Sequence, residues 1–169
     1  RRQRQMCIRD STLFLLRELN LKLRPKLLDL KPGTRVVSNT FTMDNWQPDD
    51  RIDTGGECQS WCSAMMWIIP AKVGGTWRLT QGQLNLTQEF QMVSGTLTTG
   101  GAVLPISEGR LRGDQITFTA GSTRYTGLVS GSTIQGTSIG AGTSGQWSAT
   151  RSASGNQVPS RTRVAPRQP

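Results

Sequence analysis

The chain of 169 residues has no histidine and only three cysteines, Cys7, Cys58 and Cys62. A structural zinc site takes four ligands, mainly Cys and His, and so few of these are present that we predict no metal site. In an extended strand, the spacing of Cys58 and Cys62 separates their α-carbons by about 13 Å. A disulfide needs about 7 Å or less, so we predict free thiols.

Long apolar runs are also absent. No stretch approaches the roughly 20 apolar residues that cross a membrane. The one early run, residues 13–16, is too short for a secretory signal. We therefore predict no transmembrane segment. No signal peptide is visible, but we expect the true N-terminus to be missing, so the compartment stays open, with the cytoplasm as the default.

Acidic residues are too few to balance the basic ones, and the net charge is +9. Arginines in the two ends, residues 1–11 and 152–169, carry much of this excess. Basic tails attract phosphate backbones without sequence preference, but no aromatic residues lie between these arginines to stack on bases. We predict disordered, solvated ends and no specific nucleic-acid partner.

The N-terminal segment, residues 1–11, has a further feature. The string MCIRDS at 6–11 resembles a translated sequencing-adapter string that recurs at the ends of proteins assembled from metagenomic reads. On this interpretation, residues 1–11 are a sequencing artefact placed before the protein's own sequence.

Residues 12–41 have the pattern of a strand, a helix and a second strand. An apolar run comes first, leucines then recur at helical spacing over 18–30, and a β-branched run starts at Thr34. Pro25 is expected to kink or split the helix. This order is the βαβ unit of a parallel sheet.

The next segment is predicted to close that sheet. Residues 43–50 are rich in turn formers, which favours a loop over a helix. Residues 51–54 are then expected to pair with 63–69 as a hairpin across Gly55-Gly56. We place the first domain at 12–72.

Residues 73–151 change to short β-type runs separated by glycines. The pattern at 109–116 recurs at 127–134, and each copy predicts a strand, a two-residue turn and a strand. We expect an antiparallel β-meander of roughly six to eight strands, curled into a sandwich or partly open barrel. Trp77 and Trp147 are expected to fill its core.

Arg112-Gly113-Asp114 spells the integrin-binding tripeptide within the first copy of this pattern. It falls where the hairpin needs its turn. We interpret it as turn chemistry and not as an adhesion motif.

Four stretches carry a resemblance to a known family. They are LNLKLRPKLL at 19–28, LKPGTRVVS at 30–38, a Trp-x-Pro-Asp element at 46–49 and WIIPAKVGGTWRLT at 67–80. These stretches resemble the C-terminal part of bacterial class I S-adenosylmethionine-dependent methyltransferases. The nearest group is the ATP synthase c-subunit lysine methyltransferases, which are protein-lysine N-methyltransferases.

The resemblance implies an α+β fold. Its first part would be the truncated half of a Rossmann-like methyltransferase sheet, built from strand, helix, strand and β-hairpin. In the family, the strand that ends near Pro70 lies antiparallel beside the strand of 34–41. The antiparallel β-meander would be an appended β-domain.

The cofactor site of that family has no counterpart in this sequence. Relatives cradle S-adenosylmethionine on a glycine-rich turn after their first strand. Here no G-x-G-x-x-G precedes a helix, and Gly74-Gly75 and Gly100-Gly101 precede β-type runs, as turns do. We predict a fragment without catalytic or cofactor-binding residues, inactive by itself, whose cofactor and protein substrate belong to the full-length enzyme.

The resemblance also places the substrate. In relatives, the turn after the fourth strand faces it, which puts Leu16, Arg17, Glu18 and Asn20 nearest the reaction. Arg17 departs from the family, in which many members have proline at this position, and Asn39 stands where many have histidine.

Four carboxylates, Asp44, Asp49, Asp50 and Asp53, follow the second predicted strand. We interpret them as a solvated acidic loop. The alternative is that they meet a cationic substrate such as a lysine side chain.

Two other classes of function stay open. The β-domain could be a binding module that recognises a protein or glycan partner, or the chain could be a nonfunctional fragment. The oligomeric state is also open. A truncated sheet would leave the strand at 12–16 as a bare apolar edge, which favours aggregation.

Overall fold

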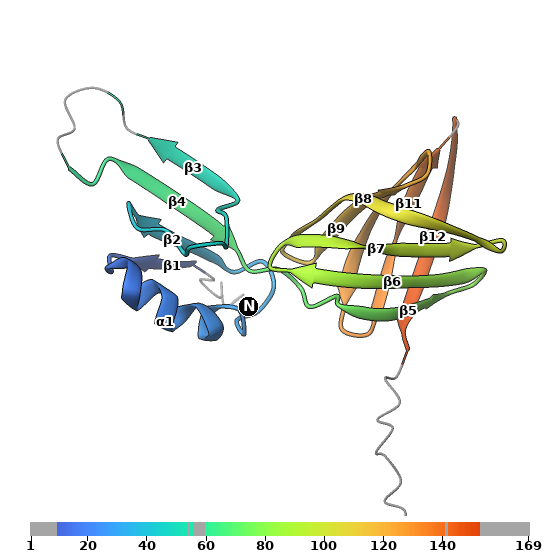
Figure 1. Ribbon diagram of the computed structural model, residues 1–169, viewed down its shortest axis with the longest axis horizontal. Coiled ribbons are helices and arrows are strands. Elements are labelled where there is room, and N and C mark those ends of the chain that lie inside the picture. The colour runs from blue at the N-terminus through green and yellow to red at the C-terminus, as the bar shows by residue number, and fades with distance from the viewer. Residues whose placement is uncertain (1–9, 54, 56–59, 141, 153–169) are drawn as a thin grey trace, which may run out of the picture.

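The computed structural model describes residues 10–53, 55, 60–140 and 142–152. Two parts follow one another along the chain (Figure 1): a small sheet with one helix, and a β-barrel. Of the predicted disordered ends, 1–11 and 152–169, residues 1–9 and 153–169 lie outside the described residues, whereas Asp10 and Ser11 belong to a strand.

The first part is a four-stranded sheet with the order β1-β2-β4-β3. Its elements are β1 (Asp10–Leu13), α1 (Arg17–Leu27), β2 (Arg35–Asn39), β3 (Asp50–Asp53) and β4 (Ser63–Ile68). β1 and β2 are parallel, with α1 connecting them, and β4 lies antiparallel to both β2 and β3. The pairing of β3 with β4 is the one that the sequence predicted for these segments.

Helix α1 covers one face of this sheet. Its apolar side chains, with those of β2 and β4, form a buried cluster that includes Leu27, Val36, Met65 and Trp67, and Leu23 packs against this cluster. The helix passes through Pro25 and ends two residues later. Proline lacks an N–H, so Pro25 cannot bond the carbonyl of Leu21; α1 is not split there but ends within one turn of it.

The second part is an eight-stranded antiparallel barrel. Each strand pairs with the next along the chain, and β12 returns to pair with β5. Its strands are β5 (Gly75–Leu79), β6 (Gly82–Glu89), β7 (Met92–Thr99), β8 (Ala102–Arg112), β9 (Gln115–Ala120), β10 (Thr123–Ser130), β11 (Thr133–Gly140) and β12 (Thr143–Arg151).

The predicted fold class is therefore wrong. Instead of an α+β chain with a sandwich or partly open barrel, the described residues are mostly strand, with α1 as their one helix, and the barrel is closed. Closure removes both unpaired edges of the meander, which is its physical advantage over an open sheet. Strand periodicity alone cannot reveal whether the first and last strands meet.

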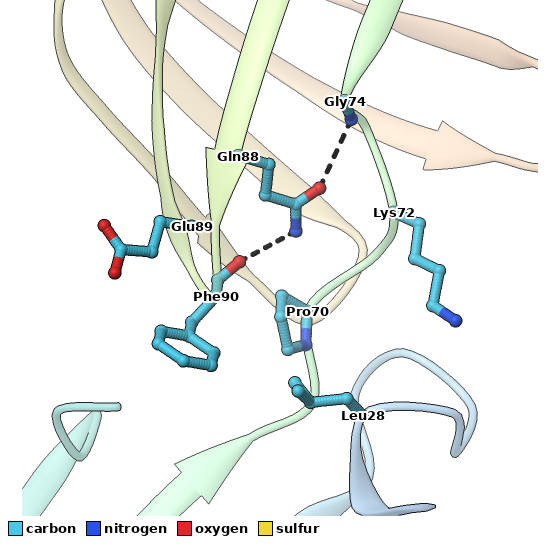
Figure 2. Close-up of a pocket in the computed structure, with 7 residues that line it drawn as sticks. All are labelled: Leu28, Pro70, Lys72, Gly74, Gln88, Glu89 and Phe90. Atoms are coloured by element: carbon cyan, nitrogen blue, oxygen red, sulfur yellow. Dashed lines mark hydrogen bonds between the residues drawn. The ribbon is translucent and has the colours of Figure 1, made fainter. Parts of the chain in front are cut away.

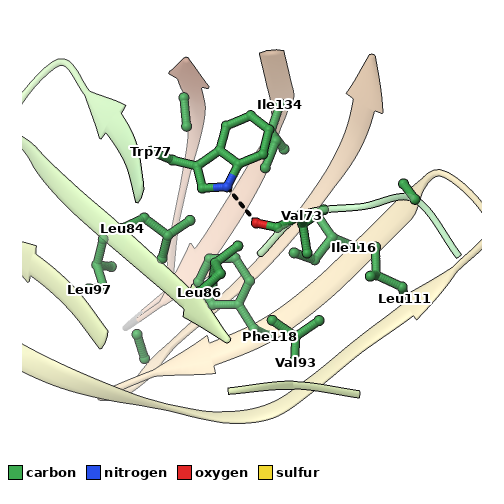
Figure 3. Close-up of a cluster of buried hydrophobic side chains, with 13 residues drawn as sticks. Val73, Trp77, Leu84, Leu86, Val93, Leu97, Leu111, Ile116, Phe118 and Ile134 are labelled. Atoms are coloured by element: carbon green, nitrogen blue, oxygen red, sulfur yellow. Dashed lines mark hydrogen bonds between the residues drawn. The ribbon is translucent and has the colours of Figure 1, made fainter. Parts of the chain in front are cut away.

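The barrel interior is filled by side chains, as Figure 3 shows. Trp77 is fully buried, and its indole N–H donates to the Val73 carbonyl at 2.7 Å. Trp147 is half-buried and packs edge-on against Phe118 and Tyr125 at centroid distances of 5.7 Å. The prediction of a core tryptophan is confirmed for Trp77, whereas Trp147 packs at the margin of the core.

Arg151 fixes the connection between sheet and barrel to the place where the barrel closes. Its guanidinium lies 4.4 Å from the centroid of the Trp77 ring, and it donates to the carbonyls of Lys72 and Gly74. The last residue of β12 thus holds the segment that leads into β5.

The two repeated hairpins have the predicted two-residue turns, Gly113-Asp114 and Gly131-Ser132. Gly113 also contacts the first part of the molecule, because a β-carbon placed on it would lie 3.0 Å from the α-carbon of Gly33. Its carbonyl accepts the Ala71 N–H at 2.8 Å. Gly113 is buried, so the tripeptide around it is a turn at the junction of the two parts.

These two turns offer a matched pair of substitutions. Both glycines have positive φ, +65° at Gly113 and +57° at Gly131, but a β-carbon on Gly131 would meet no atom within 4 Å. We expect Gly131→Ala to lower the free energy of unfolding by about 1–2 kcal/mol through backbone strain. Gly113→Ala should cost about 1 kcal/mol more through its contact with Gly33. Urea denaturation measures both, and equal losses would show that the contact contributes nothing.

Candidate functional site

The residues predicted to face a substrate lie at the carboxyl end of β1. The chain leaves β1 at Leu13, turns through residues 14–16 and enters α1 at Arg17. Since β1 and β2 are parallel, the carboxyl end of β2 lies beside this turn. Carboxyl ends of parallel strands are where open α/β sheets hold their ligands.

The structure separates the four predicted residues into two groups. Leu16, Arg17 and Glu18 are exposed, and Leu16 is exposed to 61% of its surface. Asn20 is fully buried, so it cannot touch a substrate in this conformation. The prediction that these residues form a substrate site therefore rests on the three exposed ones, with Asn20 as a support.

Asn20 ties α1 to the end of β2. Its side-chain amide donates to the Ser38 hydroxyl at 3.1 Å and to the Phe41 carbonyl at 3.3 Å, and the Ser38 hydroxyl also donates to Phe41. The oxygen Oδ1 of Asn20 has no hydrogen-bond partner among the described residues. The two donated bonds hold α1 against the carboxyl end of β2.

The four predicted carboxylates do not act together. Asp44 pairs with Arg17 at 2.6 Å, and Asp53 pairs with Arg51 at 2.8 Å. The hydrogen bond from Arg51 holds the pKa of Asp53 below its ordinary value. These pairs are exposed, and exposed pairs contribute little to stability.

Asp49 contradicts the interpretation of a solvated acidic loop. Its side chain is only 1% exposed and pairs with Arg110 of β8 at 2.9 Å. Its other carboxylate oxygen accepts the Ile68 N–H at 2.8 Å. A buried carboxylate must be paired in this way, and the partner from the barrel could not be identified from local sequence.

The whole Trp-x-Pro-Asp element joins the sheet to the barrel. Trp46 is buried and stacks on Phe90, with centroids 5.6 Å apart and an interplanar angle of 13°. The Gln47 carbonyl accepts the side-chain N–H of Gln91 at 2.7 Å. Phe90 and Gln91 connect β6 to β7, and sequence reasoning missed both. The available signal was a large aromatic residue inside a hairpin turn, where polar residues are usual.

A cavity of about 510 Å³ lies beside this junction. It is lined by apolar residues, by Lys72 and Glu89, and by Gln88, as Figure 2 shows. The amide of Gln88 is fully used: its oxygen accepts from Val73 and Gly74, and its nitrogen donates to Ala71 and Phe90. Gln88 therefore braces the connection, and Lys72 in the cavity lining is paired with Asp29.

Cys62 corrects the prediction of free thiols, because it is disulfide-bonded. Cys7 and Cys58 lie outside the described residues. The spacing argument assumed an extended strand, but β4 begins only at Ser63, and Trp61 has a positive φ of 63°. Within the described ranges, no group of three or more potential ligands could hold a metal.

The described residues do not fit S-adenosylmethionine. A cofactor cradle needs a glycine-rich turn between a strand and a helix, so that backbone N–H groups can approach the ligand. The one strand-to-helix turn described, residues 14–16, is Phe-Leu-Leu.

In the described part of the chain, no helix is long and apolar enough to cross a membrane.

Comparison with known proteins identifies one short similarity. A segment of 42 residues is 52% identical to a protein-lysine N-methyltransferase of the archaeon Saccharolobus islandicus (strain REY15A). The match covers 24% of this chain and 26% of the relative, so the chain spans about a quarter of that protein's length. No protein family and no solved structure matches the chain. The similarity indicates a methyltransferase relationship.

The buried pair at the junction yields a stability prediction. We expect Asp49→Ala to lower the free energy of unfolding by about 2–3 kcal/mol, because it removes two hydrogen bonds and leaves Arg110 without its partner. The control is Asp29→Ala, which breaks an exposed pair with Lys72 and should cost about 0.5 kcal/mol or less. Thermal denaturation measures the stability of both variants, and equal losses of stability would contradict the role of Asp49.

Proposed function

We propose that this chain supplies the substrate side of an S-adenosylmethionine-dependent protein-lysine N-methyltransferase. The observation that carries the proposal is the 42-residue similarity to the archaeal protein-lysine N-methyltransferase. The parallel pair β1 and β2, with an exposed turn at their carboxyl ends, agrees with a ligand site there.

In this proposal, the exposed residues Leu16, Arg17 and Glu18 border the path of the lysine side chain. Asn20 acts as a positioning residue through its bonds to Ser38 and Phe41. The cofactor supplies the methyl group in the full-length enzyme. Transfer to an amine depends mainly on proximity and alignment, so the task of these residues is to hold the amine in place.

The barrel has a structural role in this proposal. Its interior is filled, and its β6–β7 and β8–β9 turns contact the sheet part. It therefore braces the sheet from the end opposite the proposed substrate site (Figure 1).

The first test concerns the cofactor. The chain alone should not bind S-adenosylmethionine, since the described residues offer no glycine-rich cradle. Isothermal titration of the folded chain with S-adenosylmethionine is expected to give no binding heat. Micromolar binding would mean that the cofactor site is in this chain after all.

The second test concerns methyl transfer. The 42-residue segment of the archaeal enzyme is replaced by its counterpart from this chain, and lysine methylation by the chimera is compared with that of the parent. We expect activity within about tenfold of the parent, because the substituted segment performs the same task. Thermal melting controls for folding, and a folded chimera without activity would refute the proposed function.

A further inference from the structure

Three aromatic side chains meet at the end of the sheet that lies away from the barrel. Phe14 follows β1, Phe41 follows β2 and Trp61 precedes β4. The Trp61 ring lies 5.4 Å from the Phe14 ring and 5.3 Å from the Phe41 ring, between centroids. We call Phe14, Phe41 and Trp61 the aromatic cluster.

This cluster is open to solvent. Phe14 is 69% exposed, Trp61 is 49% exposed and Phe41 is half-buried. The rings are tilted to one another by 45° and 59° and do not stack flat. The three side chains together form a partly exposed apolar surface, and contiguous surfaces of this kind mark interaction sites.

Hydrogen bonds hold the strained backbone beside the cluster in place. Trp61 has φ of 63° and Thr40, just before Phe41, has φ of 61°. Non-glycine residues in this region are disfavoured and persist where their surroundings hold them. Here the Thr40 N–H donates to the Ser63 carbonyl at 2.7 Å, and the Asn39 amide donates to the Trp61 carbonyl at 3.2 Å. Both bonds join the chain beside Phe41 to the chain beside Trp61.

The described cations that lie over aromatic rings do so elsewhere in the structure. Two other aromatic rings already carry one, since Arg24 lies over Phe90 and Arg151 over Trp77. Among the described residues, no lysine or arginine is recorded over Phe14, Phe41 or Trp61.

The charges near the cluster also favour a cation. Of the described arginines, Arg17 is the nearest to Phe14 along the chain and pairs with Asp44, and Arg35 is the nearest to Phe41 and pairs with Asp10. Glu18 adds a carboxylate in the first turn of α1. Carboxylates thus offset the positive charge of the arginines nearest the cluster along the chain.

We propose that the aromatic cluster binds the ammonium group of a lysine side chain, in its free or methylated form. Aromatic faces attract cations, tryptophan most strongly, and methylated ammonium groups add apolar contact and are less strongly hydrated. This inference rests on the proposed function and names the group that the substrate side recognises. It adds Phe14, Phe41 and Trp61 to the residues that sequence reasoning placed there.

The test is a titration of the full chain, without cofactor, with Nα-acetyl-trimethyllysine methylamide. The control ligand is its neutral tert-butyl isostere, in which carbon replaces the charged nitrogen. The readout is the NMR signal of the Trp61 indole N–H, identified among the five tryptophans by its loss in Trp61→Phe. We expect the neutral ligand to bind about 3- to 30-fold more weakly, and the unmethylated lysine ligand to lie between the two.

Variants separate ring chemistry from apolar area. Trp61→Leu and Phe14→Leu keep an apolar side chain but remove the aromatic ring. Each should weaken binding of the cation, as measured by calorimetry. Trp61→Phe keeps a ring and should weaken binding less than Trp61→Leu does. Leu128→Ala, at an exposed apolar position on the barrel, should leave it unchanged. If Trp61→Leu does not fold, Phe14→Leu decides the question.

Equal binding of the cationic and neutral ligands would overturn the inference, as would wild-type affinity in a folded Phe14→Leu variant. A dimer that dissociates on Phe14→Leu would overturn it as well, since a second copy would then cover the rings. The titration involves no cofactor. If the cation does not bind but the chimera is active, only the inference about the aromatic cluster is refuted. If the cation binds but the folded chimera is inactive, the proposed role in methyl transfer is refuted instead.

Discussion

The carboxylate of Asp49 is buried where the sheet meets the barrel, and both parts depend on it. It accepts the N–H of Ile68 in β4 and pairs with Arg110 in β8, so one buried side chain joins a strand of the sheet to a strand of the barrel. A buried charge is stable only when such partners are present. The stacking of Trp46 on Phe90 adds the apolar half of the same junction.

The Trp-x-Pro-Asp element has a structural role at this junction. Its residues hold the barrel and take no part in the candidate site, which lies at the other end of the sheet (Figure 1). The strands β2 and β4 connect the two ends and carry the buried cluster under α1. A rigid scaffold fixed at one end, with exposed side chains at the other, is a suitable platform for positioning a substrate.

Local patterns predicted local structure. The leucine spacing indicated a helix where α1 is found, and the glycine-centred turns at 113–114 and 131–132 join the strands that the pattern expected. The failures concern distant partners. The fold class was wrong because closure depends on β12 meeting β5, and Asp49 was misjudged because Arg110 is 61 residues away.

The sequence by itself determined the strands, the turns and the resemblance to methyltransferases, because each depends on residues within a few positions of one another. Only the tertiary structure decided that the barrel closes, that Asp49 is buried and that Phe14, Phe41 and Trp61 converge. These features join segments far apart in the chain. Backbone hydrogen bonding across the sheets brings them together, and no local pattern contains that pairing.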